Sequence, residues 1–310
     1  MELNIDYVSD LHLTHYISKN ESITKIDKLV QDKISMQVKG DILVVAGDID
    51  EDINRVSELL YSCSKYYKKV IFVLGNHEYY IPVIKYIYTD PMAKEYNYNS
   101  MNKVYRLNEI FKDNKDIIIL DKTNNTKGLY TYNTFLLAGD TLWYKPVTLV
   151  DKLYNYPMQN DSRFILSELS KKDKIQKLHN DSISWYNNLP NNIDLIITHV
   201  PPFRNKSNSR GNNSCYYTEV KEYKSPVWIY GHDHKEEDII INNTRLVSNP
   251  WGYDTKEFKI KTLTQESSEI NPCKSRTRIL VILLFPFLCQ DCLHCHFRYY
   301  MAISKNLQLK

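Results

Sequence analysis

The chain has 310 residues, which is enough to bury a sizeable core in one large domain or two small ones. Its hydrophobic and charged fractions, 43% and 25%, are ordinary for a soluble globular protein. The net charge of +3 is too small to indicate a nucleic-acid surface, but it does not exclude a phosphate substrate, since bound cations can supply local positive charge.

Three strand-and-turn units are predicted within the first 80 residues. Residues 3–9, 42–46 and 70–74 are strand-like, and the last two are continuous apolar runs typical of strands buried on both faces. Residues 23–38 and 53–67 between them have helical spacing. The polar residues that follow the three strands are Asp10 and His12, then Asp48 after Gly47, and then Asn76 and His77.

Further elements are predicted downstream. They are helix with loops over 79–115, strands at 117–120 and 134–137, a helix over 164–189, strands at 193–198 and 226–230, and a hairpin of 239–241 with 245–248. The strands at 193–198 and 226–230 again lead into polar residues, His199 and then His232 and His234. Because open α/β sheets bind ligands at the carboxyl ends of their strands, we expect these side chains to converge.

The composition changes near residue 266. We predict one domain over 1–265 and a C-terminal appendage over 266–310, with 265–268 structureless and the rest a poorly ordered extension. Two other interpretations of the appendage are zinc binding by its three closely spaced cysteines and His296, and membrane contact by the short apolar run 279–285.

The rest of the chain predicts a cytoplasmic protein with no membrane span. No apolar run reaches the ~18 residues that a span needs, and residues 1–6 lack a signal-peptide pattern. Cys63 and Cys215 are isolated, which suits a reducing compartment.

The polar residues at the strand ends are of the types that bind metal ions. Carboxylate, imidazole and amide oxygen suit manganese, iron or zinc, and the absence of cysteine argues against a structural zinc site. Asp10 and His12 are two apart, so in an extended segment they point the same way and can chelate one ion. His232 and His234 have the same spacing and could hold one ion or divide between two.

Each block alone has an ordinary structural interpretation, such as a hydrogen-bonded histidine or a turn. Asp48 follows a glycine that allows a sharp turn, and its carboxylate has two oxygens with which to bridge two cations. The tetrapeptides Gly-Asn-His-Glu and Gly-His-Asp-His are each expected roughly once per 160,000 random positions, so their joint occurrence is not chance.

In order along the chain, the blocks are Asp-x-His, Gly-Asp, Gly-Asn-His-Glu, His and Gly-His-x-His, and over about residues 3–253 they resemble the calcineurin-like metallophosphoesterases. Residues 139–143, 158–165 and 249–253 look like a subgroup of small stand-alone bacterial and phage members. The resemblance implies an α/β fold, a calcineurin-like four-layer α/β/β/α sandwich with two mixed sheets.

The resemblance also implies roles for particular residues. Asp48 would bridge two metals, and His77 would not ligate but would face the substrate as general acid. Asp140 imitates the Gly-Asp block, but the family does not use that position as a ligand. The remaining implied ligands are Asp10, His12 and His234 for one metal, and Asn76, His199 and His232 for the other.

The implied function is a metal-dependent phosphoesterase that hydrolyses a phosphate mono- or diester by attack of a metal-bridging hydroxide. It would use two divalent or trivalent ions, with manganese expected and iron or zinc as alternatives. The protein-phosphatase branch has Asp-Arg-Gly shortly after its Gly-Asp, whereas residues 49–52 here are Ile-Asp-Glu-Asp, which argues against a protein phosphatase. The competing hypothesis is a catalytically silent binding or scaffold protein with the same fold.

The partner predicted by this function is a phosphate-ester substrate. Nucleic acid is not excluded, but a nuclease should carry a basic track for the backbone, and the sequence has no dense basic cluster. Arg204, Lys206 and Arg210 in the loop after His199 could bind a single phosphate group or be solvated charge. The sequence leaves the oligomeric state open.

Overall fold

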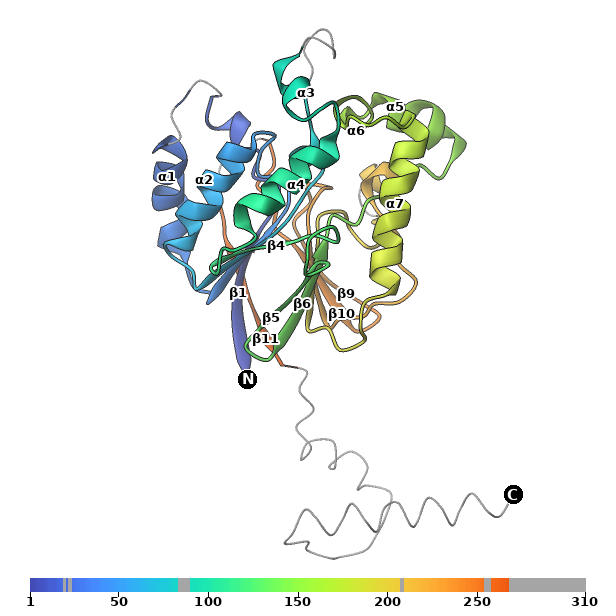
Figure 1. Cartoon of the computed structure of the whole chain (residues 1–310). Helices are drawn as coiled ribbons and strands as arrows, with labels where there is room; N and C mark the ends of the chain where they lie inside the picture. The colour runs from blue at the N-terminus through green and yellow to red at the C-terminus, as the bar shows by residue number, and fades with distance from the viewer. Residues whose placement is uncertain (19–20, 22–23, 83–89, 207–208, 254–257, 268–310) are drawn as a thin grey trace, which may run out of the picture. The chain divides into compact units, whose positions relative to one another are not determined.

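Two mixed β-sheets form the body of the protein (Figure 1). The computed structural model describes residues 1–18, 21, 24–82, 90–206, 209–253 and 258–267, all within the compact unit Met1–Ser268. The first sheet has the order β11-β1-β2-β3-β4 and the second the order β5-β6-β7-β8-β10-β9. Helices α2 and α4 lie over the first sheet and α7 lies beside the second, so the predicted α/β fold with two mixed sheets is confirmed.

The first sheet contains β1 (Glu2–Val8), β2 (Ile42–Ala46), β3 (Lys69–Val73), β4 (Ile117–Leu120) and β11 (Lys261–Glu266). The second contains β5 (Leu129–Tyr132), β6 (Phe135–Asp140), β7 (Leu195–Thr198), β8 (Val227–Tyr230), β9 (Glu237–Ile241) and β10 (Thr244–Ser248). The α-helices are α1 (Thr24–Leu29), α2 (Ile53–Ser64), α3 (Pro91–Glu95), α4 (Ser100–Phe111), α5 (Tyr156–Met158), α6 (Asn160–Phe164) and α7 (Lys171–Asn187).

Strand β2 shows why the sheets stack. All five of its residues are buried, and it pairs in parallel with β1 and β3. Because successive side chains alternate between faces, Leu43 and Val45 pack into the core under the helices, whereas Val44 and Ala46 pack into the core between the sheets. A strand that is apolar on both faces is stable only between two layers.

Two strands were not predicted. Strand β11 pairs antiparallel with β1 along its length and buries Leu263, so the prediction that residues 265–268 are structureless is wrong for Gln265 and Glu266. Strand β5 pairs with β6 through a turn at Asn133, which has a positive φ of 54°. Both are edge strands with a weak apolar signal in the sequence: β11 exposes alternate polar side chains, and the β5 side chains are half-buried apart from the exposed Thr131.

Helix α7 starts later than predicted, at Lys171 instead of residue 164. The Ser170 hydroxyl accepts the backbone N–H of Asp173 at 3.2 Å and donates to its carboxylate at 2.6 Å, which fixes the N-terminus. The predicted hairpin is confirmed: β9 and β10 pair antiparallel across Asn242 and Asn243, both with positive φ, as tight hairpin turns require.

Residues 268–310 lie outside the described residues, so the structure tests none of the three interpretations of the appendage. The domain boundary after residue 265 stays a prediction. In the described part of the chain, no helix combines the length and apolar character that crossing a bilayer requires. Cys63 and Cys215 are both free and buried.

Candidate metal centre

Five of the predicted ligands leave their strands on left-handed backbone. Their φ angles lie between 45° and 73°, a region that non-glycine residues rarely adopt and that must be held by surrounding structure. Here the loops after β1 and β2 hold each other, since the backbone N–H of Asp10 donates to Gly47 O and that of His12 to Asp48 O, both at 3.0 Å. The five residues are Asp10, His12, Asp48, His232 and His234. The premise that Asp10 and His12 lie in an extended segment is therefore wrong, although their side chains do converge.

Two glycines allow the loops to approach this closely. Gly47 has φ 86°, and a Cβ there would overlap the ring of His199 and lie 2.7 Å from Gly75 Cα. A Cβ on Gly75 would collide with the carboxylate of Asp48. Glycine at both positions is thus a condition for bringing Asp48 against the strand-end histidines.

Asp10, His12 and His234 form one group of potential ligands, with their ligand atoms all within 4.8 Å of one another. The ring Nε2 atoms of His12 and His234 are 3.1 Å apart, and His234 Nε2 is 3.3 Å from Asp10 Oδ1. The Asp10 carboxylate also accepts the Ser9 hydroxyl at 2.5 Å and the backbone N–H of His232 at 3.0 Å.

Asp48, His199 and His232 form a second group, and Asn76 Oδ1 lies within hydrogen-bond distance of both histidine rings. His199 donates its Nδ1–H to Ala46 O at 2.8 Å, and His232 donates its Nε2–H to Cys215 O at 3.0 Å. The other nitrogen of each ring faces Asn76 Oδ1, at 2.9 Å for His199 and 3.1 Å for His232. Backbone carbonyls that fix the outer nitrogen leave the inner one available to a cation, as in known metal-binding histidines.

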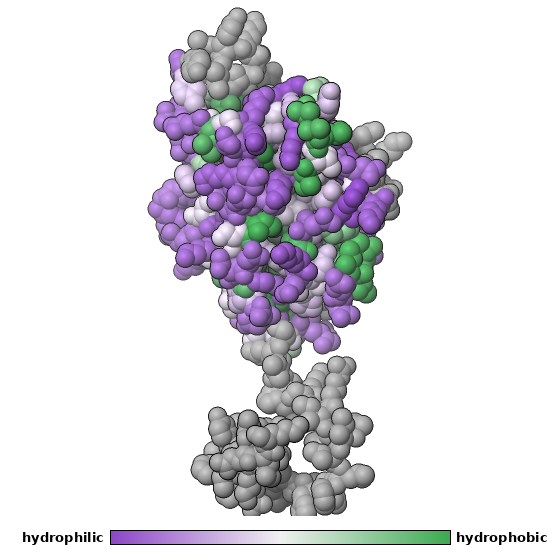
Figure 2. Space-filling view, turned by 90° about the vertical axis from the view of Figure 1, so that its right-hand side faces the viewer, coloured by the Kyte–Doolittle hydropathy of each residue, from purple (hydrophilic) through white to green (hydrophobic). Residues whose placement is uncertain are grey.

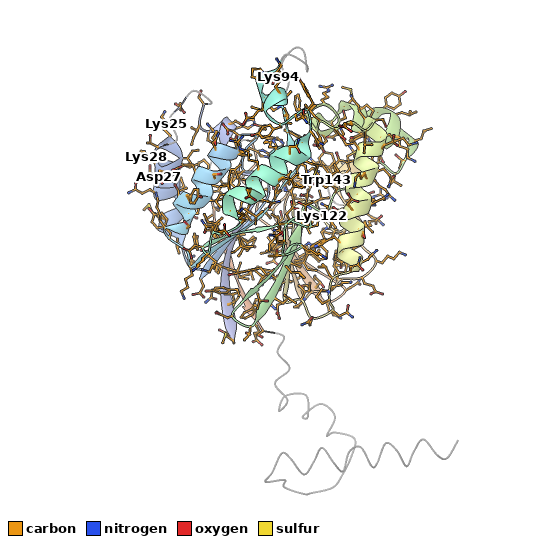
Figure 3. All side chains as sticks on the ribbon, viewed as in Figure 1. Lys25, Asp27, Lys28, Lys94, Lys122 and Trp143 are labelled. Carbon is orange, nitrogen blue, oxygen red and sulfur yellow. The ribbon has the colours of Figure 1, made fainter. Side chains whose placement is uncertain are left out.

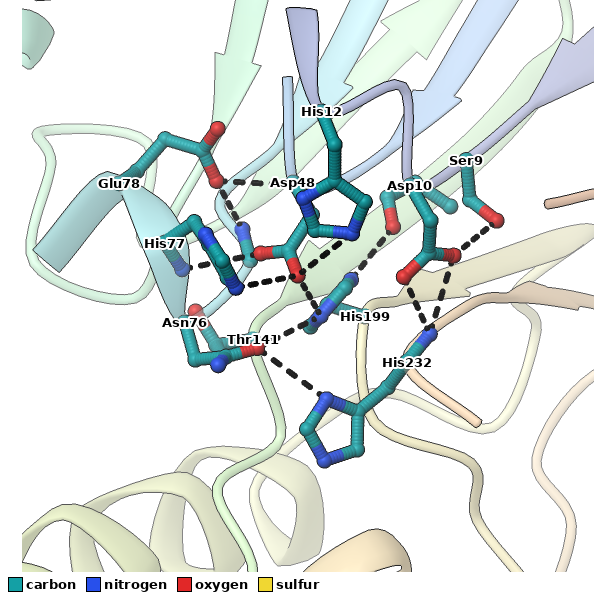
Figure 4. Close-up of polar contacts among 12 residues, drawn as sticks. Ser9, Asp10, His12, Asp48, Asn76, His77, Glu78, Thr141, His199 and His232 are labelled. Carbon is teal, nitrogen blue, oxygen red and sulfur yellow. Dashed lines mark hydrogen bonds and ion pairs between the residues drawn. The ribbon is translucent and has the colours of Figure 1, made fainter. Parts of the chain in front are cut away.

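Asp48 lies between the two groups (Figure 4). Its Oδ2 is 3.2 Å from His199 Nε2 and 3.8 Å from the Nε2 atoms of both His12 and His77. His12, Asp48 and His77 form a third possible metal-binding group, so geometry alone permits His77 to be a ligand. His232 and His234, whose division was left open by the sequence, fall into different groups.

His77 has an acidic partner that sequence reasoning missed. Its Nδ1 lies 3.0 Å from Glu51 Oε1, which leaves Nε2 on the Asp48 side. Glu51 belongs to residues 49–52, whose lack of arginine argues against a protein phosphatase, but nothing in that sequence indicates a contact with His77.

Asn76 is oriented by a buried aspartate, also missed. Its amide nitrogen donates to Asp161 at 2.9 Å and to the Tyr80 hydroxyl at 2.8 Å, which turns its oxygen toward His199 and His232. The hydroxyls of Tyr80 and Tyr144 both donate to Asp161.

Glu78 holds the loop after β2. Its buried carboxylate accepts the backbone N–H groups of Gly75 at 2.6 Å, Ile49 at 2.8 Å and Asp48 at 3.1 Å. Glu78 was visible as the last residue of the Gly-Asn-His-Glu block, but the block by itself did not indicate this contact.

Burial and nearby carboxylates separate the histidines into two with lowered pKa values and two with raised pKa values. Burial lowers the pKa of His12 to about 3 and that of His232 to about 4, because desolvation disfavours the charged ring. At His199 and His77 burial acts in the same direction and is the largest single effect. The Asp48 carboxylate outweighs it only together with other acceptors, Asp10 for His199 and Glu51 for His77, and the pKa values rise to about 10 and about 9. In the metal-free protein, protons therefore occupy sites where a cation would compete with them.

A cavity of about 240 Å³ opens over these groups. Arg210 lines it, with the guanidinium 5.0 Å from the Tyr216 ring centroid and Nη1 3.5 Å from His232 O. Arg204 instead donates within its own loop, to Gly211 O at 2.8 Å. Of the three basic residues noted in this loop, the structure thus brings Arg210 to the cavity.

Asp140 lies apart from the metal-binding groups found among the described residues. Its buried carboxylate pairs with Lys122 at 2.8 Å and accepts the Ser182 hydroxyl at 2.7 Å. Figure 3 labels Lys122 within the body of the molecule, in contrast to Lys25 and Lys28 at its edge on α1. Asp140 is therefore part of a structural ion pair.

The comparisons with known proteins agree with this geometry. A model of the calcineurin-like phosphoesterase family matches residues 3–236. The chain belongs to the calcineurin-like phosphoesterase family. It is a metal-dependent hydrolase acting on phosphate esters, and its Asp and His groups indicate divalent metal binding.

One sequence relative and one structural neighbour show how far the similarity extends. The chain is 26% identical over 283 residues to the uncharacterized protein L509 of Acanthamoeba polyphaga mimivirus, which covers 80% of this chain and 90% of that protein. The phosphopantetheinyl hydrolase of Mycobacterium tuberculosis has a TM-score of 0.56 at 15% identity, covering 84% of this chain and 95% of that chain. At this identity the second likeness shows the fold alone.

Proposed function

We propose that this phosphoesterase uses two metal ions, held on either side of Asp48, to hydrolyse a phosphate mono- or diester. The observation that carries the proposal is the position of Asp48 Oδ2, 3.2 Å from His199 Nε2 on one side and 3.8 Å from His12 Nε2 on the other. Asp10, His12 and His234 would hold one ion, and Asn76, His199 and His232 the other, with Asp48 shared.

The donor set fits such ions. It combines imidazole nitrogens, carboxylates and one amide oxygen, which manganese, iron and zinc all accept, and we expect manganese to support activity in vitro. Metal ions bound there supply Lewis acidity: they activate water and offset charge on phosphoryl oxygens.

The chain's own residues supply the remaining steps. Glu51 holds the His77 ring by Nδ1, so Nε2 is placed at the cavity to donate a proton to the departing oxygen. Arg210 provides a fixed positive charge in the cavity lining, suited to a phosphoryl oxygen. The cavity is small, about 240 Å³, so it accepts the phosphate-bearing part of the ester while the rest extends outside.

Metal analysis combined with an Asp48→Asn variant tests the proposal. The wild-type protein should contain two metal ions per chain, lose activity to a chelator and regain it with Mn²⁺. Asp48→Asn should lower both metal content and turnover, because one charge serves both groups. The control is Asp238→Asn, which changes an exposed ion pair with Arg245 and should retain both properties. Active protein with at most one metal per chain would refute the two-metal assignment.

A further inference from the structure

The segment 147–158, here called the apolar segment, exposes an unusual number of apolar side chains. Six of the fifteen large hydrophobic side chains exposed in the described part of the chain lie in these twelve residues. A concentration of this kind on a globular surface indicates an interaction site. Figure 2 faces the side of the molecule that carries α5 and α7, and shows apolar patches within a mostly hydrophilic surface. The six residues are Val147, Leu149, Val150, Leu153, Tyr154 and Met158.

The apolar segment is held in place from beneath. It contains a π-helical turn, Asp151–Asn155, followed by α5. The buried Asp151 carboxylate accepts the Ser214 hydroxyl and the Asn155 amide, both at 2.6 Å, and Tyr156 is buried in the core. The fold therefore fixes these turns while it points their apolar side chains at solvent.

The exposed charged side chains within residues 145–158 are basic, and Glu219 and Lys221 line a groove beside Lys145 and Val147. Lys145 and Lys152 are exposed, whereas Asp151, the only acidic residue from 145 to 158, is buried and hydrogen-bonded. Protein interfaces favour tyrosine, tryptophan and arginine, but four of the six exposed side chains here are valine or leucine. Aliphatic side chains on helical turns, flanked by lysine, are typical of segments that lie in the surface of an anionic membrane.

The apolar segment is also continuous with the cavity. Met158 belongs to both, and Gln159 and Asn160 carry the chain along the cavity lining. A single small ligand in the cavity cannot cover side chains spread over the outer face of these turns, whereas a lipid surface adapts to them.

We propose that the apolar segment seats the protein on an anionic phospholipid surface, with the mouth of the cavity beside that surface. Val147, Leu149, Val150 and Leu153 enter the boundary between headgroups and acyl chains, and Lys145 and Lys152 contact the headgroups. This proposal does not depend on the phosphoesterase mechanism, since it concerns binding alone.

Sedimentation of the full chain with vesicles tests this surface. Wild-type protein should bind vesicles of phosphatidylcholine and phosphatidylglycerol more tightly than vesicles of phosphatidylcholine alone. Replacing both Leu149 and Leu153 with serine should weaken vesicle binding about tenfold or more, because two leucine side chains that would be buried in the lipid are lost. Ile240→Ser is the matched control: Ile240 is an equally exposed aliphatic residue on β9, and its replacement should change nothing.

Hydrolysis of a soluble aryl phosphate and an unchanged melting temperature would show that the variants are folded. Residues 268–310 are present in every variant, so they cannot produce the difference between them. Lys145→Glu with Lys152→Glu should weaken binding to the anionic vesicles selectively. Equal binding by wild type and the double serine variant would overturn the proposal, as would wild-type protein that ignores vesicles. A wild-type dimer lost in the double serine variant, without vesicle binding, would assign the surface to a second copy.

Discussion

Replacing His77 with asparagine distinguishes a proton donor from a metal ligand. The substitution removes a ring nitrogen 3.8 Å from Asp48 Oδ2 and the Nδ1 contact of 3.0 Å with Glu51. A general acid contributes about 10²–10⁴-fold, so we expect a loss within this range on an alkyl phosphate, whose alkoxide must be protonated. A p-nitrophenyl ester departs without protonation and should lose less than about tenfold.

The assay measures kcat/KM on both esters, with metal content determined in parallel. Glu51→Gln removes the carboxylate that orients the ring and should cost about 10–100-fold, with the same dependence on the leaving group. His15→Asn is the control, since His15 is exposed, lies 6.2 Å from the His12 ring and joins none of the metal-binding groups found in the described residues. Equal losses on both esters, or a metal loss that matches the activity loss, would show that the His77 ring binds metal or supports the fold.

Three further changes test the surroundings of the centre. Asp161→Asn removes the charge that orients the Asn76 amide and should weaken metal affinity about 10–100-fold. Metal titration measures this affinity, and an unchanged value would contradict the role of Asp161. Asp140→Asn leaves Lys122 buried without its counter-charge and should lower the free energy of unfolding by about 3 kcal/mol, at unchanged metal content. Denaturant titration measures this, and a stability equal to that of the wild type would refute the stabilising role of the buried pair. Truncation after Ser268 should leave turnover and solubility intact, because β11 is retained; loss of either would give the appendage a role.

The sequence by itself determined the strands that end at the centre and the ligand types that follow them. A run such as Ile42–Ala46 is apolar throughout, so its burial on both faces follows from composition alone. The carboxyl ends of parallel strands meet at one edge, so polar residues placed just after them converge without further information. Edge strands β5 and β11 escaped prediction because neither is a continuous apolar run: β11 exposes every second side chain, and none of the four β5 side chains is fully buried.

Only the tertiary structure decided which distant residues support the ligands. The contact of Glu51 with His77 and that of Asp161 with Asn76 join residues 26 and 85 positions apart, and no local pattern encodes such pairs. The division of His232 and His234 between two groups depends on left-handed backbone at both residues, and the backbone N–H of His232 is held by Asp10 in the loop after β1. The exposure of the apolar segment is also decided only by the tertiary structure. In a sequence, apolar residues indicate burial, and only the fold shows that no other element covers these side chains.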